Sequence, residues 1–233
     1  MRTLRLAHRG DWRHATENSL AALLAAVDVP GCDGVEFDVR ASRDGVPVLC
    51  HDDTLRRVHG VDARVDSLTW AELERIGLVS LEDVLAAVPR HAFLDVELKG
   101  DPGRGAFEIL AAGRGPALER AVVSSFRPAT LERVAGLAPA WPRWLNADVL
   151  DEATIATAVD LECRAVSIKW QGLSDRAFRQ ARAAGLEVVA WTIRRRPTRA
   201  RLERLGVAAI CVEGPALEDS SDGQPEPAPG SSA

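Results

Sequence analysis

Lysine is scarce in this chain. Only Lys99 and Lys169 occur, so 27 of the 29 basic residues are arginine. This bias indicates a compositional drift in which arginine replaced lysine wherever the exchange was harmless. The two remaining lysines need individual explanations, because a compact ammonium and a planar guanidinium are not equivalent at a binding site. The net charge of −5 argues against a nucleic-acid-binding protein, since such proteins present a basic face.

Cysteine pairs and long apolar segments are also lacking. The four cysteines are widely scattered without a C-x-x-C pair, which argues against a zinc site or a disulfide framework. No apolar run approaches the ~20 residues of a membrane span. The first residues contain no apolar segment typical of a signal peptide. We therefore expect a cytoplasmic protein that does not span a membrane.

The chain does contain an alternation of short apolar runs with helical patterns. Helices are predicted most clearly at residues 18–27, 175–184 and 198–205. The predicted strands are Leu4–Ala7, Val35–Val39, Val46–Cys50, Ala92–Leu98, Ala121–Ser124, Arg143–Leu145, Ala165–Ile168, Glu187–Ala190 and Ala208–Val212. Roughly eight strand–helix units predict an α/β fold, a (β/α)8 TIM barrel, with a doubly wound open sheet as the alternative.

We expect one domain over residues 1–217, because α/β barrels of this size form single units. From Glu218 to Ala233 the chain is rich in serine, proline, glycine and glutamate, and contains no apolar residue larger than alanine. Such a composition buries too little surface to offset the entropy of ordering, so residues 218–233 are predicted to be a disordered tail.

Titratable residues recur at the carboxyl ends of the first four predicted strands, where TIM barrels carry their active sites. These residues are His8, Glu36, Asp38, His51, Glu97 and Lys99. Residues two apart in a strand point to the same face, so Glu36 shares a face with Asp38, and Glu97 with Lys99. We therefore expect these side chains to converge at one mouth of the barrel.

Three converging carboxylates repel one another unless a cation holds them. Oxygen ligands favour a hard ion, so we expect one divalent cation, Mg²⁺ or Ca²⁺. Two histidines at the same rim supply a general acid and a general base near neutral pH. Arg9 and Lys99 can neutralise a phosphate. The combination predicts a metal-dependent enzyme that cleaves phosphodiesters.

Motifs in this order resemble the glycerophosphodiester phosphodiesterase family, with a similarity that extends to about Pro215. The motifs are His8-Arg9-Gly10 with Glu17-Asn18-Ser19, Glu36-Phe37-Asp38-Val39, Asp44-Gly45-Val46-Pro47-Val48 with His51-Asp52-Asp53-Thr54-Leu55, Val96-Glu97-Leu98-Lys99, Ser124-Ser125-Phe126, and Ala190-Trp191-Thr192-Ile193. The first four are together highly specific. Thr16, Ser19, Arg194 and Glu213 depart from the usual family pattern, and none of them belongs to the predicted chemistry.

The resemblance implies a TIM barrel that hydrolyses glycerophosphodiesters, small molecules, to glycerol phosphate and an alcohol. It implies an insertion at about residues 53–80. The implied roles are acid/base catalysis for His8 and His51, metal ligation for Glu36, Asp38 and Glu97, and phosphate binding for Arg9 and Lys99. Trp191 and Phe126 are interpreted as walls of the substrate pocket, and Glu17 and Asn18 as supporting residues.

Two alternatives to hydrolysis stay open. One is a phospholipase D-like lyase that uses the same barrel and metal but releases a cyclic phosphate. The other is a non-catalytic binding barrel, which the presence of both histidines argues against. Lys169 and the run Arg194–Arg196 are interpreted as solvated surface, and the sequence does not indicate an oligomeric state.

Overall fold

Eight parallel strands close into a barrel in the computed structural model, which describes residues 2–218. The barrel strands are β1 (Leu4–His8), β2 (Gly34–Ala41), β4 (Phe93–Leu98), β5 (Ala121–Ser125), β6 (Arg143–Ala147), β7 (Ala165–Lys169), β8 (Glu187–Ile193) and β9 (Ala209–Val212). They pair in the order β1-β9-β8-β7-β6-β5-β4-β2, and β1 also pairs with β2. This last pairing closes the ring, which confirms the predicted barrel and excludes the open sheet.

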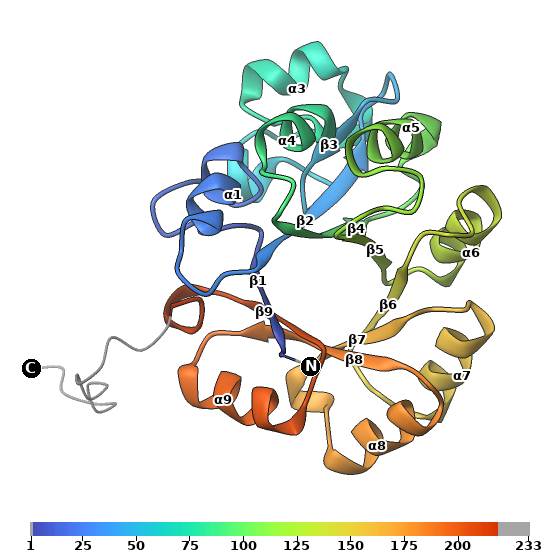
Figure 1. Ribbon diagram of the computed structural model, residues 1–233. Helices are drawn as coiled ribbons and strands as arrows, with labels where there is room; N and C mark the ends of the chain where they lie inside the picture. Colours follow the sequence, from blue (N-terminus) through green and yellow to red (C-terminus); the bar gives the residue numbers. More distant parts are fainter. Residues whose placement is uncertain (1, 219–233) are drawn as a thin grey trace, which may run out of the picture.

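Helices surround the barrel (Figure 1). They are α1 (Leu20–Val27), α2 (Arg56–His59), α3 (Trp70–Ile76), α4 (Leu81–Ala87), α5 (Gly103–Arg114), α6 (Pro128–Leu137), α7 (Glu152–Asp160), α8 (Asp175–Ala183) and α9 (Arg196–Leu205). The predicted first helix begins two residues late, at Leu20, because Asn18 adopts a φ of 56° and Ser19 is the N-cap.

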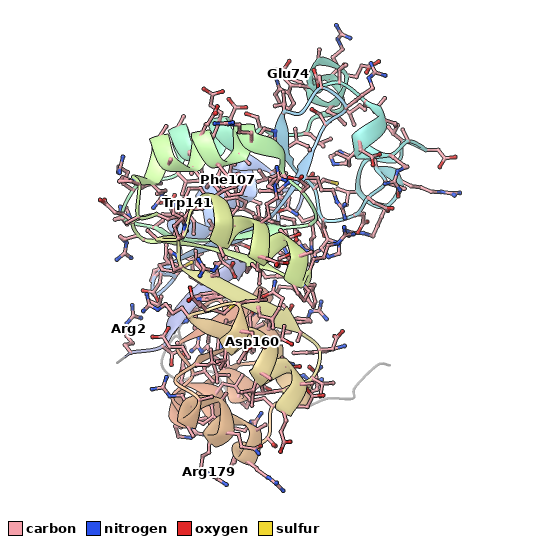
Figure 2. All side chains as sticks on the ribbon, turned by 90° about the vertical axis from the view of Figure 1, so that its right-hand side faces the viewer. Arg2, Glu74, Phe107, Trp141, Asp160 and Arg179 are labelled. Atoms are coloured by element: carbon pink, nitrogen blue, oxygen red, sulfur yellow. The ribbon has the colours of Figure 1, made fainter. Side chains whose placement is uncertain are left out.

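Apolar side chains pack on both sides of the barrel wall. The larger core lies between strands and helices; in Figure 2, Phe107 of α5 and Trp141 lie together, with ring centroids 5.4 Å apart. A smaller core fills the inside of the barrel with Leu6, Val122, Trp144, Ala165, Val189, Ala209 and Cys211. This inner core supports the polar layer above it at the carboxyl ends of the strands.

The predicted strand Val46–Cys50 forms, but it is not a barrel strand. It is β3 (Pro47–Leu49), which pairs antiparallel with the end of β2 after a turn at Gly45, where φ is 82°. The segment that follows packs on a cluster of its own, made of Val48, Cys50, Leu55, Val65, Leu73 and Leu78. Glu74 of α3 lies at the edge of the molecule in Figure 2, which places this segment beside the barrel.

The carboxyl end of the described chain is anchored at Glu218. Its carbonyl accepts a hydrogen bond from Arg199 Nη1 at 2.7 Å, and its carboxylate lies 3.5 Å from Arg196 Nη2. The rest of the predicted tail, residues 219–233, lies outside the described residues. Within residues 2–218, no helix is long and apolar enough to cross a membrane.

Gly34 begins the strand that carries Glu36 and Asp38, and it allows a close approach to the next strand. A Cβ at this position would lie 1.9 Å from the carbonyl oxygen of Phe93 and 2.5 Å from its nitrogen. Overpacking of this kind costs about 1–3 kcal/mol. We expect Gly34→Ala to lower the melting temperature by at least a few degrees, because one kcal/mol corresponds to about 2–4 °C at this size.

Gly136 on α6 is the matched control. Nothing lies within 4 Å of a Cβ built there. Gly136→Ala should stabilise the helix by about 0.5–1 kcal/mol, because alanine loses less backbone entropy than glycine. The two variants should therefore shift the calorimetric melting temperature in opposite directions. A melting temperature of Gly34→Ala at or above that of the parent chain would contradict the close approach of β2 and β4.

Candidate active site

A cavity of about 460 Å³ opens at the carboxyl ends of the barrel strands. Most of the predicted site residues line it: His8, Arg9, Glu17, Glu36, His51, Glu97, Lys99, Phe126 and Trp191. Asp38 and Asn18 are both buried next to this wall and are hydrogen-bonded to each other. The barrel thus brings together side chains that are separated by up to 183 positions in the sequence, from His8 to Trp191.

Three buried carboxylates lie together at one side of the cavity. Glu36 and Asp38 come from β2, and Glu97 comes from β4, directly beside Asp38 in the register. One oxygen from each carboxylate lies within 4.8 Å of the others. Burial, and then the neighbouring negative charges, raise the pKa of Glu36 and of Glu97. A set of crowded carboxylate oxygens fits a hard divalent cation, which removes this repulsion.

Two cations and one amide hold Asp38. Lys99 Nζ lies 2.9 Å from Asp38 Oδ1 and also contacts Glu97, while Arg9 Nε lies 3.3 Å from Asp38 Oδ2. Asn18 Nδ2 donates to Asp38 Oδ2 at 2.7 Å, and Asn18 Oδ1 accepts from the Asp38 amide. Burial opposes the ionisation of Asp38, but Lys99 and Arg9 outweigh it and keep its pKa below the usual range.

Each of the two site histidines is bonded to a carboxylate. His8 Nδ1 lies 2.6 Å from Glu213 Oε1, and His51 Nδ1 lies 2.7 Å from Asp52 Oδ1. Such a partner favours the tautomer with the proton on Nδ1, which leaves Nε2 available for proton transfer. Burial lowers the pKa of His51, which favours the neutral ring that can accept a proton.

A chain of ion pairs links the insertion to the site. Arg57 of α2 donates to Glu17 at 2.6 and 3.0 Å and to Asp52 at 2.6 Å. Glu17 also accepts from Arg9 Nη1 at 2.9 Å. Glu17 does not cap the nearby helix α1, because Ser19 is the N-cap. The guanidinium of Arg57 thus links Glu17, which contacts Arg9, to Asp52, which contacts His51.

Two aromatic side chains form a wall of the cavity. The rings of Phe126 and Trp191 meet edge to face, with centroids 5.5 Å apart. Trp191 is fixed by a hydrogen bond from Nε1 to the Ser167 carbonyl at 3.0 Å. Phe126 is 42% exposed, which places it at the mouth. Lys99 Nζ lies 5.9 Å from the Phe126 ring centroid.

Glu213 was expected to take no part in the chemistry but contacts a site histidine, whereas Arg194 has the solvated side chain expected for it, 71% exposed. Glu213 is buried, and its carboxylate accepts from Arg194 Nε at 2.6 Å as well as contacting His8. Both residues line the cavity. Lys169, in contrast, has a half-exposed side chain 3.8 Å from Asp148, in agreement with a surface role.

Further cavity residues are not among the site residues that the sequence predicts. Asp95 lies two residues before Glu97 and faces the same side; burial raises its pKa to about 7, although Ser124 Oγ donates to it at 2.6 Å. The spacing of two residues between Asp95 and Glu97 could have predicted that both side chains share a face of the strand. Glu213 directly follows the last strand, as Lys99 directly follows β4, and could have been found in the same way. Arg57 has no comparable signal, because it lies in the irregular insertion.

Comparison with known proteins agrees with this geometry. Residues 8–217 match the profile of the glycerophosphoryl diester phosphodiesterase family. A glycerophosphodiester phosphodiesterase from Caldanaerobacter subterraneus subsp. tengcongensis is 26% identical, over 92% of this chain and 96% of the relative. The structure of a Thermotoga maritima glycerophosphodiester phosphodiesterase superposes with a TM-score of 0.78 at 22% identity, covering 94% of this chain and 96% of that one.

A second solved structure carries a ligand. It is a phosphodiesterase from Oleispira antarctica in complex with the product sn-glycerol-3-phosphate, with a TM-score of 0.76 and 26% identity over 91% of this chain and 93% of that one. The family match covers nearly all of the described residues and includes both histidines and all three clustered carboxylates. The chain therefore belongs to the glycerophosphoryl diester phosphodiesterase family.

Proposed function

We propose that this enzyme hydrolyses glycerophosphodiesters to glycerol phosphate and an alcohol, using one divalent cation and the pair His8 and His51. The observation that carries the proposal is the meeting of three buried carboxylates and two carboxylate-bonded histidines around one cavity. The substrate is a small molecule. The cytoplasmic location expected from the sequence stays a prediction.

Glu36, Asp38 and Glu97 are the residues that would hold the cation. Their oxygen-only donor set and mutual repulsion suit Mg²⁺ or Ca²⁺. A bound divalent cation offsets negative charge on the phosphoryl oxygens. Arg9 and Lys99, which line the same cavity, provide further positive charge for the phosphate. This arrangement explains how a chain with a net charge of −5 attracts an anionic substrate.

The two histidines supply the proton transfers. Hydrolysis requires that a proton leaves the attacking water and that another reaches the departing alkoxide. His51, whose pKa burial lowers, accepts a proton at Nε2, while Glu213 orients His8 for the complementary transfer. The open-chain product in the related Oleispira structure supports hydrolysis over the lyase alternative.

The direct test is a panel of glycerophosphodiesters with choline, ethanolamine, glycerol or inositol as the alcohol. The purified enzyme with Mg²⁺ should release glycerol phosphate, detected enzymatically, and phosphorus NMR should show an open monoester. Accumulation of a cyclic phosphate as the end product would establish the lyase. Absence of turnover on the whole panel, with Mg²⁺ or Ca²⁺ present, would refute the proposed activity.

Exhaustive chelation should abolish turnover, and Mg²⁺ or Ca²⁺ should restore it. The physical reason is that three carboxylates crowd one buried site, and a cation that binds only the folded state also stabilises it. Calorimetry should show a melting temperature that rises with metal concentration. Neutralising one proposed ligand by Glu36→Gln should weaken this response. Full activity after chelation would show that the carboxylates serve another purpose.

His8→Ala and His51→Ala should each lower kcat by about 10²–10⁴-fold, the usual contribution of a proton-transfer group. Metal-induced stabilisation should persist in both variants, because the proposed ligands are carboxylates. His91→Ala is the matched control: His91 is exposed and precedes β4, at the opposite end of the barrel. A histidine whose removal left kcat within a few-fold of the parent value would lose its assigned role.

Lys99→Arg should sharply lower kcat/KM although it preserves the charge. The ammonium of Lys99 contacts both Asp38 and Glu97 within a crowded wall, where a planar guanidinium does not fit the same geometry. Lys169→Arg is the control for the same exchange, because Lys169 is half-exposed and its Nζ lies 3.8 Å from Asp148 Oδ1. This variant should change kcat/KM little. Equal, small effects at saturating metal would show that Lys99 tolerates arginine and that its compact shape is not needed.

A further inference from the structure

Two neutral polar side chains line the side of the cavity away from the carboxylates. Asn146 of β6 and Ser167 of β7 are partners in the strand register and both line the cavity. In the closed ring of strands, β6 and β7 lie opposite β1 and β2, which carry His8 and two of the three acids of the proposed metal site, Glu36 and Asp38. Asn146 is 6% exposed and Ser167 is 2% exposed, so both lie deep in the barrel.

The side chain of Asn146 has no hydrogen-bond partner within residues 2–218. Its Oδ1 atom is buried and accepts no hydrogen bond. Asn18, the other asparagine of the chain, uses both of its amide atoms on Asp38. A buried amide without partners destabilises a fold, so native proteins rarely retain one without a use. Because Asn146 faces the cavity, a ligand can satisfy it.

The chemistry of this wall indicates what kind of group it binds. A carboxamide offers donors and an acceptor, and the Ser167 hydroxyl offers one of each. Neither group is charged, so neither competes with Arg9 and Lys99 for the phosphate. Hydroxyl groups of a ligand, which both donate and accept, match such a pair. The apolar faces of Trp191 and Phe126 are suited to the adjoining carbon atoms.

We propose that Asn146, assisted by Ser167, binds the hydroxyl groups of the glycerol moiety of the substrate. The inference rests on the proposed function, since it assigns the two ends of a glycerophosphodiester. The deep end of the cavity is enclosed by strands and suits the constant part of the substrate. The mouth, where Trp12 is 39% and Phe126 is 42% exposed, leaves room for alcohols of different size.

The test compares two monophosphates that share a three-carbon chain and a phosphate. sn-Glycerol-3-phosphate carries two hydroxyls, and n-propyl phosphate carries none. Their dissociation constants are measured by calorimetry for the parent enzyme with Mg²⁺ and for Asn146→Leu, which preserves the side-chain volume. Because the variant loses hydrogen bonds to the hydroxyl groups, we expect it to bind sn-glycerol-3-phosphate about 10–100-fold more weakly than the parent does. Its dissociation constant for n-propyl phosphate should stay within about threefold of the parent value.

Ser167→Ala should weaken the binding of sn-glycerol-3-phosphate selectively as well, but only by about 3–10-fold, because one hydroxyl is removed. The melting temperature separates binding from folding: Asn146→Leu should melt at or above the parent temperature, because it removes an unsatisfied buried amide. Should the leucine variant fail to fold, Asn146→Ala provides the same comparison of ligands. In steady-state assays, the loss should appear in kcat/KM for glycerophosphocholine.

Three results would overturn the inference. They are an equal loss of affinity for both monophosphates in Asn146→Leu, an unchanged affinity for sn-glycerol-3-phosphate, and a parent enzyme that does not prefer the hydroxylated ligand. Because these measurements need no turnover, they are independent of the activity assay. A selective loss in an enzyme that hydrolyses no glycerophosphodiester would support this subsite while refuting the proposed reaction.

Discussion

The burial of three carboxylates at the ends of two adjacent strands is the constraint on which the rest of the site depends. An unpaired buried charge costs several kcal/mol, so each carboxylate requires a partner close by. Asp38 obtains Lys99, Arg9 and Asn18, and its pKa falls accordingly. Glu36 accepts a hydrogen bond from the Arg9 amide and lies 3.8 Å from His8 Nε2, and its pKa rises. This imbalance of charge is what a divalent cation would correct.

The closure of the barrel turns this local requirement into an active site. His8 and Glu213 are 205 positions apart in the sequence, yet β1 and β9 are neighbours and bring their side chains to 2.6 Å. The insertion provides the contacts around the second histidine. Its Arg57 donates hydrogen bonds to Asp52, which is bonded to His51, and to Glu17, which is bonded to Arg9. Both histidines are thus oriented by carboxylates from segments that the barrel places next to them.

Local sequence was sufficient to predict the barrel and most of the residues that gather at its cavity. Apolar runs with residue pairs two apart, such as Glu36 with Asp38, predict both a strand and the face that its charges share. The same rule applied once more would have found Asp95. The strand Val46–Cys50 was harder to place, since an apolar run does not reveal that a tight turn directs it back along β2 as an antiparallel neighbour.

Contacts between distant segments explain what the sequence did not show. Glu213 was named only as a departure from the family pattern, although its position after the last barrel strand makes it a neighbour of His8. The importance of Arg57 depends on side-chain geometry within an irregular segment, where no periodicity exists to interpret. Asn146 is conspicuous only once the fold reveals that no side chain or backbone group within the described residues satisfies its amide.

The placement of polar groups also separates chemistry from substrate choice. The carboxylates, His8 and Lys99 lie on β1, β2 and β4 or directly after them, and the strand ladders hold them rigidly. Trp12 and Arg194 lie instead in connecting segments at the mouth, and Phe126 follows the end of β5. Under the proposed function, a change at Trp12 or Phe126 would alter the space for the alcohol and leave the clustered carboxylates of β2 and β4 in place, because strand register does not depend on connecting segments. One barrel can therefore keep its phosphodiester chemistry while its mouth adapts to different alcohols.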